Sequence, residues 1–298
     1  MALITQGDWA SIVQKDLSLV FINKYRDFNS MLGYLFNFKD AEQGTEYDLE
    51  TGDIPLPGEF NGDIPYTSDQ EGYKKSVSEV EYALGIKIQR KALRNDRYGV
   101  LQTRTSLLAQ SFNARKEQLG ADVFNNANST FTVGDGLSLC NSAHTSKMSA
   151  TTQSNYGTLA LSAANLFTTE TYFKKFRTNV DNIMTNIPNL LIVPMDLRQT
   201  AFEILESAGK VDTSVNNRNY FYNAMYDVIV WDNFLTSSSA WFIANSDMMK
   251  EQLVYREWEP TQFFRSGEFD TLVLKMAGYM SCAVSSVEWR YLYGNFPA

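Results

Sequence analysis

Apolar residues in the middle of the chain repeat with the period of a long helix. They step by seven, four, seven and four positions, which places them on one helical face: Leu101, Leu108, Phe112, Leu119 and Val123. No proline occurs between Pro65 and Pro188, so nothing interrupts the pattern. The spacing predicts a helix over 96–126, about 45 Å long at 1.5 Å per residue. A helix much longer than the globular average of about 11–12 residues suggests a structural spine.

The remaining patterns predict shorter helices and many strands. An amphipathic helix is expected from Thr5 to about Lys24, and 125–158 is typical of a loop because it is rich in Asn, Ser, Thr and Gly. Further helices are expected over 162–178 and 195–207. The expected strands cover 77–94, 189–194, 228–231, 240–244, 253–258, 271–277 and 279–291, of which 189–194, 228–231 and 240–244 are expected to be buried. The order lacks strict strand–helix–strand alternation, which indicates an α+β fold.

Segment 40–71 differs from the rest of the chain because it holds ten acidic residues and no Lys or Arg. It also contains three prolines, four glycines and the near-repeat Gly-Asp-Ile-Pro at 52–55 and 62–65. A segment with so few apolar residues cannot form a core of its own. We therefore predict that it is a long projecting loop or hairpin. The alternative is a solvated, disordered loop.

The charge reverses directly after this segment. Residues 74–116 hold ten bases against three acids. We predict that the acidic extension lies on the basic face of a neighbouring copy, whereas the alternative is that the two segments pair within one subunit. The expected intersubunit residues are the acids Glu46, Asp48, Glu50, Asp53, Glu59 and Asp63 and the bases Lys87, Arg90, Lys91, Arg94, Arg97 and Arg104.

The amino-acid composition and net charge of the chain limit the kinds of molecule that it could bind. The 298 residues are 44% hydrophobic and carry a formal charge of −8, which argues against nucleic acid as the main ligand and against an anionic membrane surface. The basic run with its tyrosines could still form a nucleic-acid track, although those rings fit better beside the strand and helix. No stretch is long and apolar enough for a membrane span or a signal peptide, so we expect a soluble chain. Thirteen per cent aromatic residues suit large interfaces.

Candidate chemistry is sparse. Two cysteines and one histidine argue against a disulfide scaffold and a two-histidine metal site, and no phosphate-binding or nucleophile motif is present. The sequence therefore predicts no catalytic, cofactor-binding or metal-binding residue and no cofactor. Cys140 and His144 form the nearest approach to a dyad, but a loop histidine held by local polar groups is the favoured interpretation. On that basis His144→Ala is expected to leave function unchanged.

Three stretches and the order of elements resemble the major capsid proteins of tailed bacteriophages, of the Hong Kong 97-type fold and especially its Mu-like branch. Residues 118–127, with Asp135-Gly136, Leu139-Cys140 and the 142–144 triplet, are similar to the end of that family's spine helix and the loop beyond it. Residues 189–201 are similar to the strand–proline–helix of its axial domain, and 287–290 to its closing segment.

The resemblance implies an N-terminal arm (1–35), an extended loop (36–78), a peripheral domain with the spine helix (79–129 and 246–298) and an axial domain (130–245). It also implies a head protein that assembles as hexamers and pentamers around enclosed DNA that it does not bind specifically. The expected partners are separate scaffolding, portal and decoration proteins, with assembly in the cytoplasm of a bacterial host. The rivals are an encapsulin-type cargo shell and an acidic-loop carbohydrate-binding or processing protein.

Overall fold

The structure is a computed structural model that describes residues 17–26, 30–64, 66, 71–89, 99–149, 151–207, 209, 219–222, 226–231, 234–268 and 273–298. Residues 17–26 are helical, in agreement with the second half of the expected N-terminal helix, whereas its first half lies outside the described residues. None of the helices in these ranges is long and apolar enough to span a bilayer.

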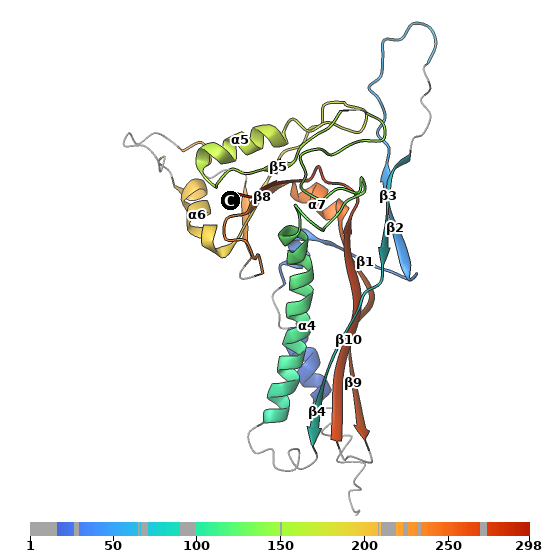
Figure 1. The fold of residues 1–298 in the computed structure, drawn as a ribbon, viewed down its shortest axis with the longest axis vertical. Helices are drawn as coiled ribbons and strands as arrows, with labels where there is room; N and C mark the ends of the chain where they lie inside the picture. Colours follow the sequence, from blue (N-terminus) through green and yellow to red (C-terminus); the bar gives the residue numbers. More distant parts are fainter. Residues whose placement is uncertain are drawn as a thin grey trace, which may run out of the picture.

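A long four-stranded sheet and the central helix form one elongated body (Figure 1). The strand order is β1 (Asn37–Asp40), β9 (Leu253–Glu268), β10 (Val273–Ser286) and β4 (Glu81–Gln89), with β1 parallel to β9 and the other pairs antiparallel. Helix α4 (Val100–Asn125) packs along the sheet. Close approach depends on Gly278, where a Cβ atom would lie 2.3 Å from the Phe112 ring.

The apolar stripe predicted for α4 is confirmed as core. Leu108, Phe112 and Val123 lie in the main core, against which the half-buried Leu119 packs, and Leu101 is buried in a smaller second cluster. Gly99 precedes the helix with φ +67°, a left-handed conformation that glycine adopts without a Cβ penalty. The helix therefore begins at Val100, while 96–98 lie outside the described residues.

We expect Phe112→Ala or Leu108→Ala to lower the free energy of unfolding by about 2–5 kcal/mol, the usual effect of emptying a large buried site. Leu107→Ala is the matched control, because Leu107 is 57% exposed on the same helix. Chemical unfolding of the purified protein measures all three. Equal stability of Leu108→Ala and Leu107→Ala would contradict the assignment of the stripe.

A second, five-stranded sheet gathers with the shorter helices at one end of the body (Figure 1). Its order is β5 (Tyr156–Gly157), β11 (Leu292–Asn295), β8 (Trp241–Ala244), β6 (Leu190–Val193) and β7 (Asp227–Val230). Strands β6 and β8 are fully buried, as apolar runs in a central position require. The expected burial of 228–231 is wrong for the strand itself: β7 is an edge strand paired with β6, and Val228 is 39% exposed.

The shorter helices follow their sequence signals only in part: the helix expected over 162–178 ends at Phe173, and two short helices were not predicted. Helix α5 (Ala163–Phe173) begins at Ser162, whose hydroxyl accepts from Asn165 N. The helix predicted after Pro194 is a 3₁₀ turn, η1 (Met195–Leu197), followed by α6 (Arg198–Glu206). Helix α7 (Ser246–Gln252) was not predicted, although Asn245 caps it through Asp247 N and Met248 N. A short helix α2 (Leu32–Leu35) precedes β1.

Predicted and observed strand boundaries differ markedly in three places. The strand expected over 253–258 is β9, which continues to Glu268. The single strand expected over 77–94 is divided, because β3 (Glu71–Ser78) ends before β4 begins at Glu81 and the two strands belong to different sheets. The two strands expected over 271–291 are instead the continuous β10, followed separately by β11. Hydrophobic pattern alone does not distinguish these cases, because strand breaks depend on which partner each segment pairs with.

A buried carboxylate joins three parts of the chain. Glu117 on α4 is 2% exposed and accepts hydrogen bonds from Ser30 Oγ, Met31 N (3.1 Å) and Trp231 Nε1 (3.1 Å). These donors come from the N-terminal segment and from the end of the second sheet. Glu117 therefore fixes how the segment of Ser30 and Met31 and the second sheet sit on α4.

Candidate functional site

The acidic segment forms a hairpin that projects from the body (Figure 1). Strands β2 (Thr45–Thr51) and β3 pair antiparallel, and residues 52–64 between them are irregular. This agrees with the predicted projecting hairpin. The first residues of the expected extended loop, 37–40, are instead β1 of the long sheet.

Asp48 attaches the hairpin to the long sheet. Its carboxylate receives a bidentate pair of hydrogen bonds from Arg256 of β9 (Nη1 at 2.9 Å) and another from Ser285 Oγ of β10. Asp48 and Arg256 are 9% and 6% exposed. Burial on its own would raise the pKa of Asp48, but the hydrogen bonds from Arg256 and Ser285 outweigh it and lower that pKa.

Glu50 and Asp53 attach the next turn of the hairpin to a second set of loops. Glu50 accepts from Tyr73 N (2.9 Å) and Asn179 Nδ2, and Asp53 accepts from Asn179 N (2.6 Å). Arg290 Nη1 lies 3.8 Å from Glu50 Oε1. Arg290 also donates a hydrogen bond to Asn179 Oδ1 (2.8 Å) and two hydrogen bonds to the carboxylate of Glu288. Burial, together with the nearby charge of Glu288, raises the pKa of Glu50.

Strand β3 is held from the side by the loop after α4. Lys147 Nζ donates to Gly72 O (2.7 Å), Tyr73 Oη lies 3.1 Å from Thr145 Oγ1, and Lys75 Nζ donates to Thr132 O. Burial lowers the pKa of Lys75 to about 8. With the acidic contacts of β2, these bonds fix both strands at the base of the hairpin.

The tip of the hairpin exposes large apolar side chains. Five are between 65% and 91% exposed: Ile54, Leu56, Phe60, Ile64 and Tyr66. The acids Glu59 and Asp63 are exposed beside them. Water disfavours so much apolar surface on a projecting arm, so the tip has the composition of a surface that another molecule covers.

The predicted intersubunit acids therefore separate into two groups. For Asp48, Glu50 and Asp53 the structure replaces the predicted intersubunit partners with partners in the same chain. Glu46 also bonds within its own turn, to Glu42 N (3.2 Å) and Gln43 N (3.1 Å). Glu59 and Asp63 lie at the exposed tip, where the expectation of an intersubunit contact remains a proposal.

Among the described residues, the cations that meet Asp48 and Glu50 are not the predicted bases. Lys87 and Arg104 are exposed, and Arg90, Lys91, Arg94 and Arg97 lie outside the described residues. The cations used are Arg256 and Arg290, more than two hundred positions beyond the acids that they meet. Charge runs report local composition, whereas strand pairing decides which distant side chains meet. The sequence did single out Arg290, because it is the last residue of the segment 287–290, which resembles the closing segment of the family named above.

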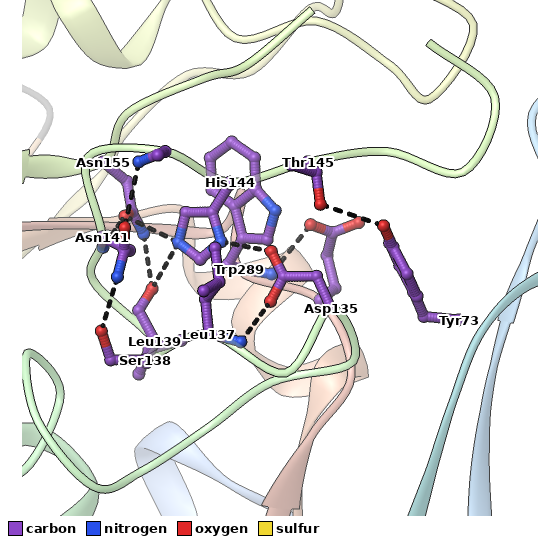
Figure 2. A network of polar contacts seen from close by, with 12 residues as sticks. Tyr73, Asp135, Leu137, Ser138, Leu139, Asn141, His144, Thr145, Asn155 and Trp289 are labelled. Atoms are coloured by element: carbon purple, nitrogen blue, oxygen red, sulfur yellow. Dashed lines mark hydrogen bonds and ion pairs between the residues drawn. The ribbon is translucent and has the colours of Figure 1, made fainter. Parts of the chain in front are cut away.

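His144 is buried in a polar network next to the hairpin base (Figure 2). Its Nδ1 lies 2.7 Å from Asp135 Oδ2, and its Nε2 faces Asn155 Oδ1 (3.1 Å) and Leu139 O (3.3 Å). The ring stacks on Trp289 at 4.3 Å. The prediction that His144 is held by local polar groups is confirmed. The expected neutrality of His144→Ala stays a prediction; the change would remove the ring from Asp135 and leave that carboxylate its backbone donors, Leu137 N among them.

The described residues hold little that could perform chemistry. No group of three His, Cys, Asp or Glu among them could bind a metal ion. Burial raises the pKa of the Cys140 and Cys282 thiols, which keeps both protonated and poorly nucleophilic at neutral pH. A cavity of about 330 Å³ at the end of α4, bordered by Phe124, Tyr156 and Phe296, carries no charged side chain. The arrangement favours a structural role for the hairpin, which has a fixed base and an exposed apolar tip.

Comparison with known proteins places this arrangement in a family. Residues 72–295 match the family described as phage capsid protein, and no curated protein matches the chain. A structure from Microbacterium phage Oxtober96 is 13% identical, with 91% of this chain and 92% of that chain covered and a TM-score of 0.62. The procapsid of bacteriophage JBD30 is 12% identical over 99% and 77% of the two chains, with a TM-score of 0.58.

A virus-like particle from Pyrococcus furiosus also matches, at 9% identity over 94% and 98% of the two chains and a TM-score of 0.53. Identities this low show the fold alone. The mixed helix-and-sheet architecture is that of the Hong Kong 97-type capsid fold, and the predicted fold is confirmed.

Proposed function

The chain belongs to the phage capsid protein family, and from this premise we propose that it is the major head subunit, whose copies form the hexamers and pentamers of an icosahedral shell around double-stranded phage DNA. Its role in the virion capsid is structural rather than catalytic. Similar folds occur in the procapsid of bacteriophage JBD30 and in the mature capsid of bacteriophage PhiM1.

The observation that carries the proposal is the hairpin. Its base is attached through buried ion pairs of Asp48 with Arg256 and of Glu50 with Arg290. Its tip lies away from the body (Figure 1), and the residues of the tip expose apolar side chains. Full burial of one Leu, Ile or Phe side chain contributes about 1.5–3 kcal/mol. A hairpin whose base is already fixed loses less conformational entropy on docking than a free segment would. The partner that fits is a second copy, repeated around the shell.

The charge of the chain supports enclosure of DNA without specific binding. A net charge of −8 does not attract phosphates overall, so packed DNA would not adhere strongly to a wall built from this subunit. We further propose separate scaffolding and portal proteins, decoration proteins on the finished shell, and assembly in the cytoplasm of the bacterial host.

The test is to express the protein alone and with the scaffolding protein of its phage, and to examine the products by negative-stain microscopy and sedimentation. We expect closed particles of uniform size. Subunits that stay monomeric at high concentration in both preparations would contradict the proposal.

An encapsulin-type shell is the second candidate, because the fold is shared with the Pyrococcus furiosus virus-like particle. Particles purified from infected or expressing cells distinguish the two. Nuclease-protected DNA of uniform length supports the phage head, whereas a stoichiometric protein cargo supports the compartment. A carbohydrate function of the acidic loop is disfavoured, because Asp48 and Glu50 are occupied by contacts within the chain.

A further inference from the structure

Asparagine is followed by glycine at one place in the chain, Asn61-Gly62 in the tip of the hairpin. The side chain of asparagine is an amide, and the backbone nitrogen of the next residue can attack its Cγ atom to close a five-membered ring. A Cβ atom on that next residue obstructs the approach, and glycine has none. Asn61-Gly62 is therefore the step of this chain where covalent structure least hinders ring closure.

The structure leaves this step exposed to water. Asn61 and Gly62 are both exposed, and neither the Asn61 amide nor the Gly62 N–H forms a hydrogen bond with another described residue. Gly62 has φ +105°, and apart from its chain neighbours no heavy atom lies within 4 Å of the place where a Cβ would stand. Within the described residues, nothing opposes the rotation that brings Gly62 N onto Asn61 Cγ.

The strand ladder does not hold these two residues either. Asn-Gly is a preferred sequence for two-residue hairpin turns, in which the flanking strands would fix both residues. Here β2 ends at Thr51 and β3 begins at Glu71, and residues 52–64 are irregular. No ladder bond of β2 and β3 therefore restrains the Asn61-Gly62 step.

The same chain offers an internal comparison at Asn128-Ser129. Asn128 is exposed like Asn61, but the next residue differs in two ways. Ser129 carries a Cβ atom, and its backbone N–H donates to Asn126 O at 3.0 Å. Ring closure at Asn128 would have to break this hydrogen bond, so the two asparagines differ in geometry while sharing one solution.

We propose that Asn61-Gly62 is a site of spontaneous modification, at which water converts Asn61 of the free subunit into aspartate and isoaspartate, and that the product weakens the contact of the tip with a second copy. The first part concerns the subunit alone. The second part rests on the proposed function.

The reaction has two steps and involves no oxidation or reduction. A bond forms between Gly62 N and Asn61 Cγ while the Cγ–Nδ2 bond breaks, and Nδ2 leaves as ammonia with the proton of the Gly62 N–H. Water then adds to one of the two carbonyl carbons of the ring that flank the nitrogen. Addition at Cγ restores the main chain and leaves an aspartate side chain. Addition at the backbone carbon of Asn61 gives isoaspartate, whose main chain runs through Cγ.

Either product changes the surface that the tip presents. It adds a negative charge between Phe60 and Ile64, which are 69% and 65% exposed, in a stretch that already holds the exposed carboxylates of Glu59 and Asp63. A contact that buries the two apolar side chains would also have to remove water from the new carboxylate, which opposes docking. Isoaspartate in addition inserts an extra carbon into the main chain and alters the spacing of Phe60 and Ile64.

The first experiment incubates the purified protein at neutral pH in water labelled with heavy oxygen and follows its peptides by mass spectrometry. Each conversion loses ammonia and takes up one labelled oxygen, which separates it from any change before the incubation. We expect Asn61 to convert at least about tenfold faster than Asn128, a difference in barrier of about 1.4 kcal/mol. Equal rates at Asn61 and Asn128 would overturn the proposal.

Two variants and a peptide test the cause. Gly62→Ala adds a Cβ atom and should slow the conversion by about tenfold or more. Asn61→Gln would have to close a six-membered ring and should stay unmodified. A synthetic peptide spanning 57–64 supplies the rate of the unfolded segment. Unchanged conversion in Gly62→Ala, or a folded subunit that converts about tenfold more slowly than the peptide, would overturn the proposal.

The second experiment compares fresh and aged subunits in assembly. Aged wild-type subunits should lose particle yield in proportion to the converted fraction, whereas Asn61→Gln subunits aged for the same time should keep theirs. Asn61→Glu carries a carboxylate from the start and should assemble less than the isosteric Asn61→Gln. Equal yields from aged wild type and aged Asn61→Gln would overturn the second part of the proposal. Fresh subunits that form no particles would contradict the proposed function instead, while the first experiment still decides the modification of Asn61.

Discussion

Replacing residues 54–63 with a short Gly-Ser linker is expected to abolish closed particles while the subunit keeps its fold. The deletion removes three of the exposed apolar side chains at the hairpin tip, Ile54, Leu56 and Phe60. It leaves Asp48, Glu50 and Asp53 in place, so the buried partners at the base stay paired. Each lost side chain contributes about 1.5–3 kcal/mol if buried in a contact, and every 1.4 kcal/mol is about tenfold in affinity.

Sedimentation velocity and negative-stain microscopy measure the particles, and circular dichroism measures the fold. The matched control is Glu59→Ser with Asp63→Ser, which removes the charges of the same tip and leaves its apolar residues. We expect this control to assemble, with a weaker dependence on salt where the Debye length falls from about 10 to 3 Å. Normal shells from the linker variant would show that the tip makes no intersubunit contact.

Arg256→Met is expected to lower the free energy of unfolding by about 3–5 kcal/mol, the usual effect of leaving a buried carboxylate without its cation. Asp48 would keep the Ser285 hydroxyl but lose both guanidinium bonds. The double variant Asp48→Leu with Arg256→Met removes both charges and should recover much of this loss. Chemical unfolding followed by tryptophan fluorescence measures both.

Arg177→Met serves as the control, because it removes the cation of an exposed ion pair. Arg177 Nε lies 3.8 Å from Asp181 Oδ1, and both side chains are nearly half exposed. Such surface pairs contribute about 0–1 kcal/mol. The lowered pKa of Asp48 means that its contribution is present above the ordinary Asp pKa of about 3.9 and is lost as the pH falls through the lower folded-state value. Equal losses in Arg256→Met and Arg177→Met would show that the Asp48 pair is solvated.

The position of the hairpin was predictable, but its contacts were not. Ten acids, three prolines and four glycines exclude a core, and that is a local property of composition. The arginines that meet Asp48 and Glu50 come from β9 and from the segment before β11. The expectation of intersubunit partners for these two acids followed from charge balance within neighbouring segments, which carries no information on long-range pairing.

For His144, too, the sequence predicts one property and only the tertiary structure shows the other. Its isolation as the only histidine excluded two-histidine chemistry from the sequence. Its burial against Trp289, with oxygen at both nitrogens, depends on residues up to 145 positions away.

The sequence by itself determined the spine, the two buried strands at the centre of the second sheet and the projecting acidic hairpin. Each of these follows from periodicity or composition within one segment, where backbone geometry alone decides which side chains share a face. Only the tertiary structure decided that β7 lies at an edge, that Arg256 neutralises Asp48, and that the 132–147 loop holds β3. These outcomes depend on which distant strands pair and on how desolvation then selects charged partners.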